Sequence, residues 1–200
     1  TKMNVYIYGP KDDPYHRDRW REEYPVDKAQ MISSLAATAT KHKVRFVWAM
    51  HPGLDIKWTD ADRKASINKL EKMYALGVRA FAIFFDDIEG AEQRNGANQA
   101  AYLNYLNEKY PDFILSYLTG AKDVDFEKFM PLLNFTPEWL SPNFAAVTPE
   151  FLAEAAKRGM KVVTWTVDQP EDLQRMIDLK VDAIITNYPD RLLKLLEENK

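Results

Sequence analysis

The stretch AFAIFFDD, residues 80–87, decides the fold and also raises the question of function. Six apolar residues in a row, with no polar residue between them, indicate a strand that is covered on both faces, as strands of parallel sheets are. An amphipathic helix pattern precedes this strand and ends at Gly77, a residue type that commonly terminates helices. The strand then runs directly into two adjacent acids, Asp86 and Asp87. Acids in this position are either solvated strand-end residues or part of a reactive site.

The same unit, a short apolar strand followed by a helix pattern, repeats along the whole chain. We expect seven strands, at residues 4–9, 44–50, 80–86, 113–118, 138–144, 161–167 and 182–187. Regular alternation of this kind indicates a (β/α) barrel or a doubly wound sheet. Because the chain has no Gly-x-Gly-x-x-Gly or P-loop motif, we predict an α/β fold of the TIM-like (β/α) barrel type. Residues 131–135 are the candidate for an eighth strand, and residues 1–200 are expected to form a single domain.

Helix starts are marked by residues that cap helices. Asp27 with Gln30 and Thr59 with Asp62 are spaced as capping boxes, in which two side chains satisfy the first backbone N–H groups of a helix. Thr148 followed by proline indicates another helix start. These positions predict helices after the first, second and fifth expected strands.

Composition excludes several classes of function. The chain of 200 residues is 46% hydrophobic, which suits a globular domain with a sizeable core. A net charge of −3 gives no basic face, so we expect no nucleic-acid partner. We also expect no membrane partner, because no apolar run approaches the roughly 20 residues of a membrane span. No signal peptide is recognised, and localisation is left open.

Metal and cofactor chemistry is also not expected. The absence of cysteine excludes disulfides, thiolate catalysis and cysteine-ligated metals. The three histidines are scattered, so no transition-metal site is predicted, and no cofactor is expected. His16 is expected to be solvated or to tie a loop, His51 to lie at a strand mouth, and Trp48 to pack in the core. For Asp12 and Asp13, which follow Lys11 in a loop, a structural role in a turn or in a salt bridge is expected rather than chemistry.

Four blocks in the first half carry a family resemblance: KMNVYIYGPKDDPYH (2–16), WREEYP (20–25), FVWAMHPGLDIKW (46–58) and GVRAFAIFFDDI (77–88). In this order they resemble the barrel of family 84 glycoside hydrolases, the O-GlcNAcase-type β-N-acetylglucosaminidases, over about residues 2–110. The resemblance implies that Asp86 polarises the 2-acetamido group of the substrate and that Asp87 is the general acid/base. It also implies that Lys57 lines the sugar site. Substrate-assisted cleavage of this kind departs from the usual pair of acid and nucleophile.

The second half resembles a different family. The blocks WLSPNFAAVTPEFLAEAAKRGMKVVTWTV (139–167) and VDAIITNYPDRLLKLL (181–196) are similar to the C-terminal half of glycerophosphodiester phosphodiesterases, over about residues 113–197. The family's metal-binding motifs are absent, so no phosphodiester hydrolysis is expected. Where that family has Leu-Gly-Val-Asp-Gly-Ile, this chain has lysine and alanine at positions 180 and 183. A positive φ at Lys180 would therefore cost on the order of 1 kcal/mol relative to glycine.

Two resemblances within one expected barrel lead to a main hypothesis and two alternatives. The main hypothesis is an engineered chimera, residues 1–112 glycosidase-like and 113–200 phosphodiesterase-like, without efficient activity. It rests on the replacement of the segments that would hold the sugar, since misplacement by about 1 Å can cost about a hundredfold in rate. The alternatives are a working β-N-acetylglucosaminidase and a weak N-acetylglucosamine-binding module, either with a small sugar as ligand. An incomplete barrel would expose two strand edges, which predicts a homodimer.

Overall fold

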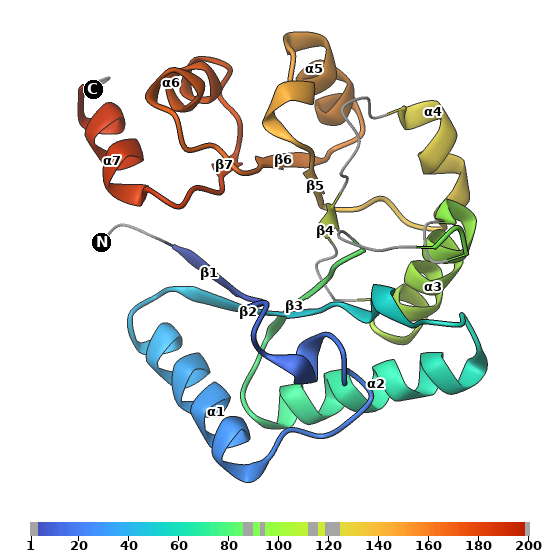
Figure 1. Ribbon diagram of the computed structural model, residues 1–200. Helices are drawn as coiled ribbons and strands as arrows, with labels where there is room; N and C mark the ends of the chain where they lie inside the picture. The colour runs from blue at the N-terminus through green and yellow to red at the C-terminus, as the bar shows by residue number, and fades with distance from the viewer. Residues whose placement is uncertain (1–3, 86–89, 93–94, 112–115, 119–124, 199–200) are drawn as a thin grey trace. The chain divides into compact units, whose positions relative to one another are not determined.

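Seven short parallel strands alternate with helices in the computed structural model, which describes residues 4–85, 90–92, 95–111, 116–118 and 125–198 (Figure 1). The strands form two sheets, ordered β1-β2-β3 and β4-β5-β6-β7. Their bounds are β1 Val5–Tyr8, β2 Arg45–Met50, β3 Ala80–Ile83, β4 Ser116–Leu118, β5 Trp139–Ser141, β6 Lys161–Thr164 and β7 Ala183–Ile184. The α/β class, the parallel pairing and the count of seven strands are thus confirmed for the described residues.

The chain divides into two compact units. The N-terminal unit comprises Met3–Leu115 and Pro131–Phe135, and the C-terminal unit comprises Ser116–Met130 and Thr136–Lys200 together with Thr1–Lys2. Each unit contains one of the two sheets. The closed barrel and the single domain therefore stay predictions.

The candidate eighth strand at residues 131–135 is wrong. The segment instead begins in a 3-10 turn, η3, at Met130–Leu132, and the rest of it is irregular. Asn104 of helix α3 (Gly96–Lys109) accepts a hydrogen bond from the backbone N–H of Asn134 at 3.0 Å and donates one to the carbonyl of Leu132 at 3.0 Å. These side-chain bonds satisfy backbone groups that a strand would use for hydrogen bonds to a neighbouring strand. The segment is therefore held against α3.

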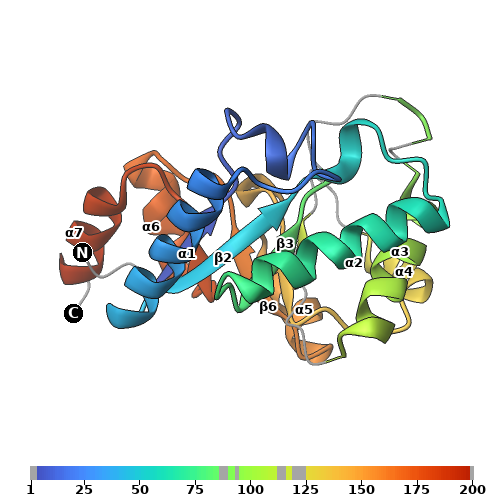
Figure 2. The same ribbon diagram turned by 90° about the horizontal axis from the view of Figure 1, so that it is seen from below.

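Helices cover the sheet of the N-terminal unit. Helices α1 (Val26–Lys41) and α2 (Asp60–Ala75) lie on the same side of the sheet in both views (Figures 1 and 2). Short 3-10 turns, η1 (Pro14–His16) and η2 (Pro52–Leu54), follow β1 and β2. The largest hydrophobic side chains that are fully buried in this unit are Trp20, Ile32, Trp48, Met50, Ile56, Met73 and Tyr102. The expected core position of Trp48 is therefore confirmed.

The predicted helix caps had mixed outcomes. Thr59 and Asp62 form the expected capping box, and Thr148 caps its helix by accepting the N–H of Phe151 at 3.1 Å. The capping box at Asp27 is wrong, because α1 has Pro25 as its N-cap, two residues before Asp27. Asp27 lies instead in the first turn, where its negative charge faces the positive end of the helix dipole.

The C-terminal unit has four helices in its described residues: α4 (Phe126–Phe129), α5 (Pro149–Lys157), α6 (Pro170–Asp178) and α7 (Pro189–Glu198), with a short turn η4 at Phe144–Ala146. Figure 1 shows α6 and α7 side by side, and their residues are in contact. One apolar cluster packs β5 and β6 against α4 and α5. A second cluster, around Val167, Leu173 and Met176, packs α6 against leucines of α7. Among the described residues, none of the helices has both the length and the apolar character to span a membrane.

Candidate functional site

The catalytic pair implied by the sequence, Asp86 and Asp87, lies outside the described residues. The chain leading to the pair is described. Beyond the end of β3, the backbone N–H of Phe84 donates to the carbonyl of Met50 at 2.8 Å, so the chain still runs beside β2 there. Phe84 and Phe85 are half-buried. The candidate site is therefore built from what surrounds the carboxyl ends of β1, β2 and β3, the edge where functional residues of parallel β/α folds gather.

Gly9 follows β1 at this edge and lies very close to its neighbours. A Cβ atom at this position would lie 3.3 Å from the Ala49 Cβ and 3.3 Å from the Phe84 Cε2. Both distances are shorter than ordinary van der Waals contact, so a side chain here would push the Phe84 ring away. Glycine at this position therefore lets the chain after β1 pack closely against the residues that lead to the acid pair.

The histidines at this edge are buried. His51 follows β2 directly, and its backbone N–H donates to the carbonyl of His16 at 2.8 Å. The Nε2 of His16 lies 2.8 Å from the carbonyl of Pro10, to which it donates as the neutral ring. Burial lowers the pKa of His16, which favours that neutral form. His16 thus ties the loop after β1, as one of the two expected roles for it predicted, and is not solvated.

Lys57, the residue implied to line the sugar site, lies in the loop between η2 and α2. Its side chain is exposed. Its backbone N–H donates to the Oδ2 of Asp62 at 2.8 Å, which fixes the loop at this point. The position leaves the ammonium available to a ligand, and the role of Lys57 in sugar binding stays a prediction.

Asp62 organises the start of α2. Its Oδ1 accepts hydrogen bonds from Nε and Nη2 of Arg21, at 3.0 and 2.6 Å. Burial alone would raise the pKa of Asp62, but these bonds and those from the N–H groups of Lys57 and Thr59 outweigh it and hold the pKa below its usual value. The lowered pKa favours the carboxylate form of Asp62, which joins the segment around Arg21 to the Lys57 loop.

Asp13 is a second buried carboxylate, and its role is structural, as the sequence predicted. Its Oδ2 accepts the hydroxyl protons of Tyr8 at 2.7 Å and Tyr24 at 2.9 Å, and its Oδ1 accepts the N–H of Tyr15 at 2.9 Å. Burial, followed by the bond to Asp13, raises the pKa of Tyr8. Three donors from β1 and the loop after it are thus satisfied by the two oxygens of one carboxylate, which holds that loop in one conformation.

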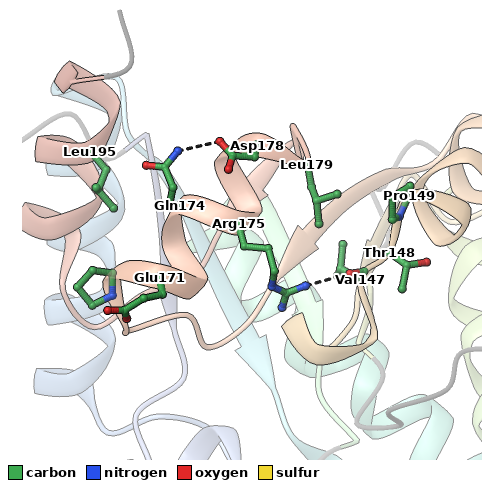
Figure 3. A pocket seen from close by; sticks show the side chains of 10 residues that line it. Val147, Thr148, Pro149, Glu171, Gln174, Arg175, Asp178, Leu179 and Leu195 are labelled. Carbon is green, nitrogen blue, oxygen red and sulfur yellow. Dashed lines mark hydrogen bonds between the residues drawn. The ribbon is translucent and has the colours of Figure 1, made fainter.

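The C-terminal unit contains a groove of about 780 Å³ beside α6, also lined by the start of α5 and by Leu195 of α7 (Figure 3). Two of its polar side chains, those of Arg175 and Gln174, are bonded within the protein. Arg175 donates to the carbonyls of Val147 at 3.2 Å and Phe144 at 2.9 Å, and Gln174 donates to Asp178 at 2.8 Å. The groove therefore has the character of a gap between helices, and we assign no chemistry to it. The described residues include no group of three or more histidines and acids that could hold a metal ion.

Comparison with known proteins gives the family. The family model described as beta-N-acetylglucosaminidase matches residues 1–115, more than half of the chain. The chain belongs to the beta-N-acetylglucosaminidase family. In agreement, it is 38% identical over 89 residues to the Protein O-GlcNAcase of Rattus norvegicus, a match that covers 44% of this chain and 10% of the rat protein. This member of the family thus spans a small part of the curated relatives that it matches.

The fold of the beta-N-acetylglucosaminidase relatives extends over nearly the whole chain. The solved structure of CpGH84B covers 93% of this chain with a TM-score of 0.71 and 32% sequence identity, and the match covers 39% of that protein. Such family 84 enzymes have a TIM-like barrel, which agrees with the predicted fold class while closure of the barrel stays a prediction.

The second half of this beta-N-acetylglucosaminidase family member also has relatives elsewhere, as the sequence indicated. A glycerophosphodiester phosphodiesterase of Caldanaerobacter subterraneus subsp. tengcongensis is 41% identical over 59 residues, covering 30% of this chain and 24% of that protein. The family model described as Dermonecrotic toxin SPH matches residues 151–200. These similarities agree with the two resemblances. They do not support an engineered chimera, and the findings favour the glycosidase alternative over it.

Proposed function

We propose that the chain acts as a β-N-acetylglucosaminidase that hydrolyses N-acetylglucosaminides with assistance from the substrate's own acetamido group. The observation that carries the proposal is the family match over residues 1–115, because this range contains Asp86, Asp87 and Lys57. In the proposed reaction, Asp86 polarises the acetamido group and its oxygen attacks the anomeric carbon. Asp87 protonates the leaving oxygen and then, as a base, activates the water that opens the intermediate.

Two adjacent carboxylates suit this division of work. When two carboxyl groups lie close together, their mutual repulsion separates their pKa values, which favours one ionised and one protonated group. The ordered loop after β1, held by Asp13, and the Lys57 loop, held by Asp62, border the same edge of the sheet. The rigid surroundings support the proposal because substrate-assisted attack requires the acetamido group to be held in a narrow range of positions.

The test is hydrolysis of two aryl N-acetylglucosaminides, one with a poor and one with a good leaving group. Asp87→Ala is expected to lower kcat/KM about a hundredfold or more for the poor leaving group and much less for the good one, which needs no protonation. Asp86→Asn is expected to lower kcat/KM for both substrates, because the nucleophile is the same in each. Asp18→Ala, which changes an exposed acid near the same edge, is the matched control and is expected to leave both rates unchanged.

Equal turnover by the parent and Asp87→Ala, or no turnover by the folded parent, would contradict the proposal. In the second case, a rise in melting temperature on adding N-acetylglucosamine would instead support a sugar-binding module. No shift would support a chain without native activity.

A further inference from the structure

Trp58 has a backbone conformation that is rare for a residue with a side chain. Its φ is +61°, in the left-handed region that favours glycine. The residue lies in the loop between β2 and α2, directly after Lys57 and directly before the N-cap Thr59. Strained backbone of this type persists only where the surrounding structure enforces it, and it is concentrated at functional sites.

Asp62 enforces the conformation from both sides of Trp58. Its Oδ2 accepts the backbone N–H of Lys57 at 2.8 Å and that of Thr59 at 3.4 Å, so one carboxylate oxygen binds the residues before and after the tryptophan. Arg21 holds the other oxygen of the same carboxylate. The strained residue is therefore fixed by a network that involves its neighbours and leaves its indole ring free to serve another purpose.

The indole ring lies against the chain on both sides of the acid pair. Its ring centre is 5.7 Å from that of Phe85, the residue directly before Asp86. Its Nε1–H donates to the backbone carbonyl of Glu92, on the far side of the pair, at 3.1 Å. Trp58 thus contacts the segment that enters the acid pair and the segment that leaves it.

A third ring anchors this arrangement to two helices. Tyr102 of α3 lies 6.0 Å from the Trp58 ring and 5.9 Å from the Phe85 ring, in edge-to-face contacts. It is 1% exposed, and its hydroxyl bonds to the Oγ of Ser66 in α2 at 2.5 Å. Because Tyr102 is fully buried and bonded, the cluster of Trp58, Phe85 and Tyr102 has a rigid base.

We infer that Trp58 is a positioning residue for the acid pair, and that it holds the chain before Asp86 and after Asp87 through Phe85 and the carbonyl of Glu92. This role rests on the proposed glycosidase function. It differs from that of a sugar-stacking platform, because the ring and the N–H of Trp58 are directed to protein groups. Loss of a positioning residue lowers kcat, whereas loss of a stacking platform raises KM.

The test uses Trp58→Phe, which retains an aromatic ring and removes the N–H that bonds to Glu92. Hydrogen exchange of backbone amides in residues 84–92 is expected to become about tenfold faster, because a bond that restrains local opening is lost. For the aryl substrate with a poor leaving group, kcat is expected to fall about tenfold or more with KM within about twofold of the parent. Melting temperature and the exchange of β1 and β2 amides should stay close to the parent values, showing that the variant is folded.

Trp165→Phe is the matched control for the exchange measurement, because Trp165 also donates its Nε1–H to a backbone carbonyl, that of Ser141, at 2.8 Å. It lies in the C-terminal unit and is expected to leave exchange of residues 84–92 unchanged. Unchanged exchange in Trp58→Phe would overturn the inference. A raised KM at unchanged kcat would also overturn it, in favour of a sugar platform. If the parent itself shows no turnover, the proposed function fails, and the exchange measurement still decides whether Trp58 holds this segment.

Discussion

The ammonium nitrogen of Lys69 lies 4.3 Å from the centre of the Tyr24 ring. Lys69 is on α2 and is 3% exposed, and the rings of Tyr15 and Trp48 are each 5.9 Å from the same nitrogen. The nitrogen also donates to the carbonyl of Glu22. A lysine charge thus lies in an aromatic cage that joins α2 to the loop after β1, an arrangement in which cation–π attraction offsets part of the cost of burying the charge.

This buried charge predicts a specific dependence of stability on pH. Burial lowers the pKa of Lys69 to about 8, although the negative charges of Asp13, Glu22 and Glu23 oppose the shift. In the unfolded chain the pKa returns to about 10.4. Between these two pKa values the unfolded state binds more protons than the folded state. The contribution of Lys69 to the free energy of unfolding therefore rises as the pH increases from about 8 to about 10. The slope is up to about 1.4 kcal/mol per pH unit. Below pH 8 both states are protonated and this contribution is flat.

Lys69→Met tests the prediction, since methionine fills similar space without a charge. Urea unfolding at pH 7, 8, 9 and 10 is expected to show a smaller rise in the free energy of unfolding for the variant than for the parent. Lys64→Met, at an exposed lysine on the same helix, is the control and should follow the parent curve. Parallel curves for Lys69→Met and the parent would mean that Lys69 does not titrate in this range.

Asp13→Asn is predicted to destabilise the N-terminal unit. An asparagine can still accept the N–H of Tyr15, but its amide nitrogen cannot accept the hydroxyl protons of Tyr8 and Tyr24. Two buried bonds to a carboxylate are lost, and we expect the free energy of unfolding to fall by about 2–4 kcal/mol in urea titrations. Asp12→Asn, at the exposed neighbouring acid, should change it by less than about 0.5 kcal/mol. A similar loss in both variants would show that net charge, and not the hydrogen bonds, is responsible.

The strands were predictable because their signal is local. Continuous apolar runs in the sequence located all seven strands of the described residues. The expected ranges were longer than the observed strands. Residues 161–167, for example, give a strand only to Thr164, after which Trp165 directs its indole to the carbonyl of Ser141. The error at 131–135 has a similar cause, since the bonds that remove this segment from a sheet come from Asn104, 30 positions from Asn134.

The surroundings of the site were less predictable, because they depend on partners distant in sequence. The carbonyl that Lys69 binds, on Glu22, is 47 positions away, and Arg21 is 41 positions from Asp62. The spacing of Thr59 and Asp62 did predict a capping box. It gave no sign that the same carboxylate also binds Lys57 and so fixes Trp58 in a left-handed conformation. His16 was ambiguous because three arginines closely follow it in sequence, whereas in the fold its ring is buried.

The edge of β1 predicts self-association. Val5, Tyr6 and Ile7 are all exposed. Because successive side chains of a strand point to opposite faces, the exposure of all three means that both faces of the sheet are uncovered at this edge strand. We expect dimers at high protein concentration, measured by light scattering after size-exclusion chromatography. Tyr6→Lys should weaken them, because charge on an edge strand opposes pairing. Tyr74→Lys is the control, at a helix tyrosine that is 49% exposed against 48% for Tyr6. Equal weakening by both changes, or a monomer at all concentrations, would contradict pairing through this edge.

Lys180 has a φ of +56° between α6 and β7, so the left-handed conformation on which the expected cost depends is present. The N–H of Lys180 donates to the carbonyl of Ile177 at 2.9 Å, a turn that ends the helix and that glycine adopts without strain. Lys180→Gly is therefore predicted to raise the free energy of unfolding by about 1 kcal/mol, as the relief of the left-handed conformation exceeds the added entropy of the unfolded chain. Lys180→Ala removes the same side chain but retains a Cβ, so it should give no such gain. Equal stabilities of the glycine and alanine variants in urea titrations would show that the left-handed backbone costs little here.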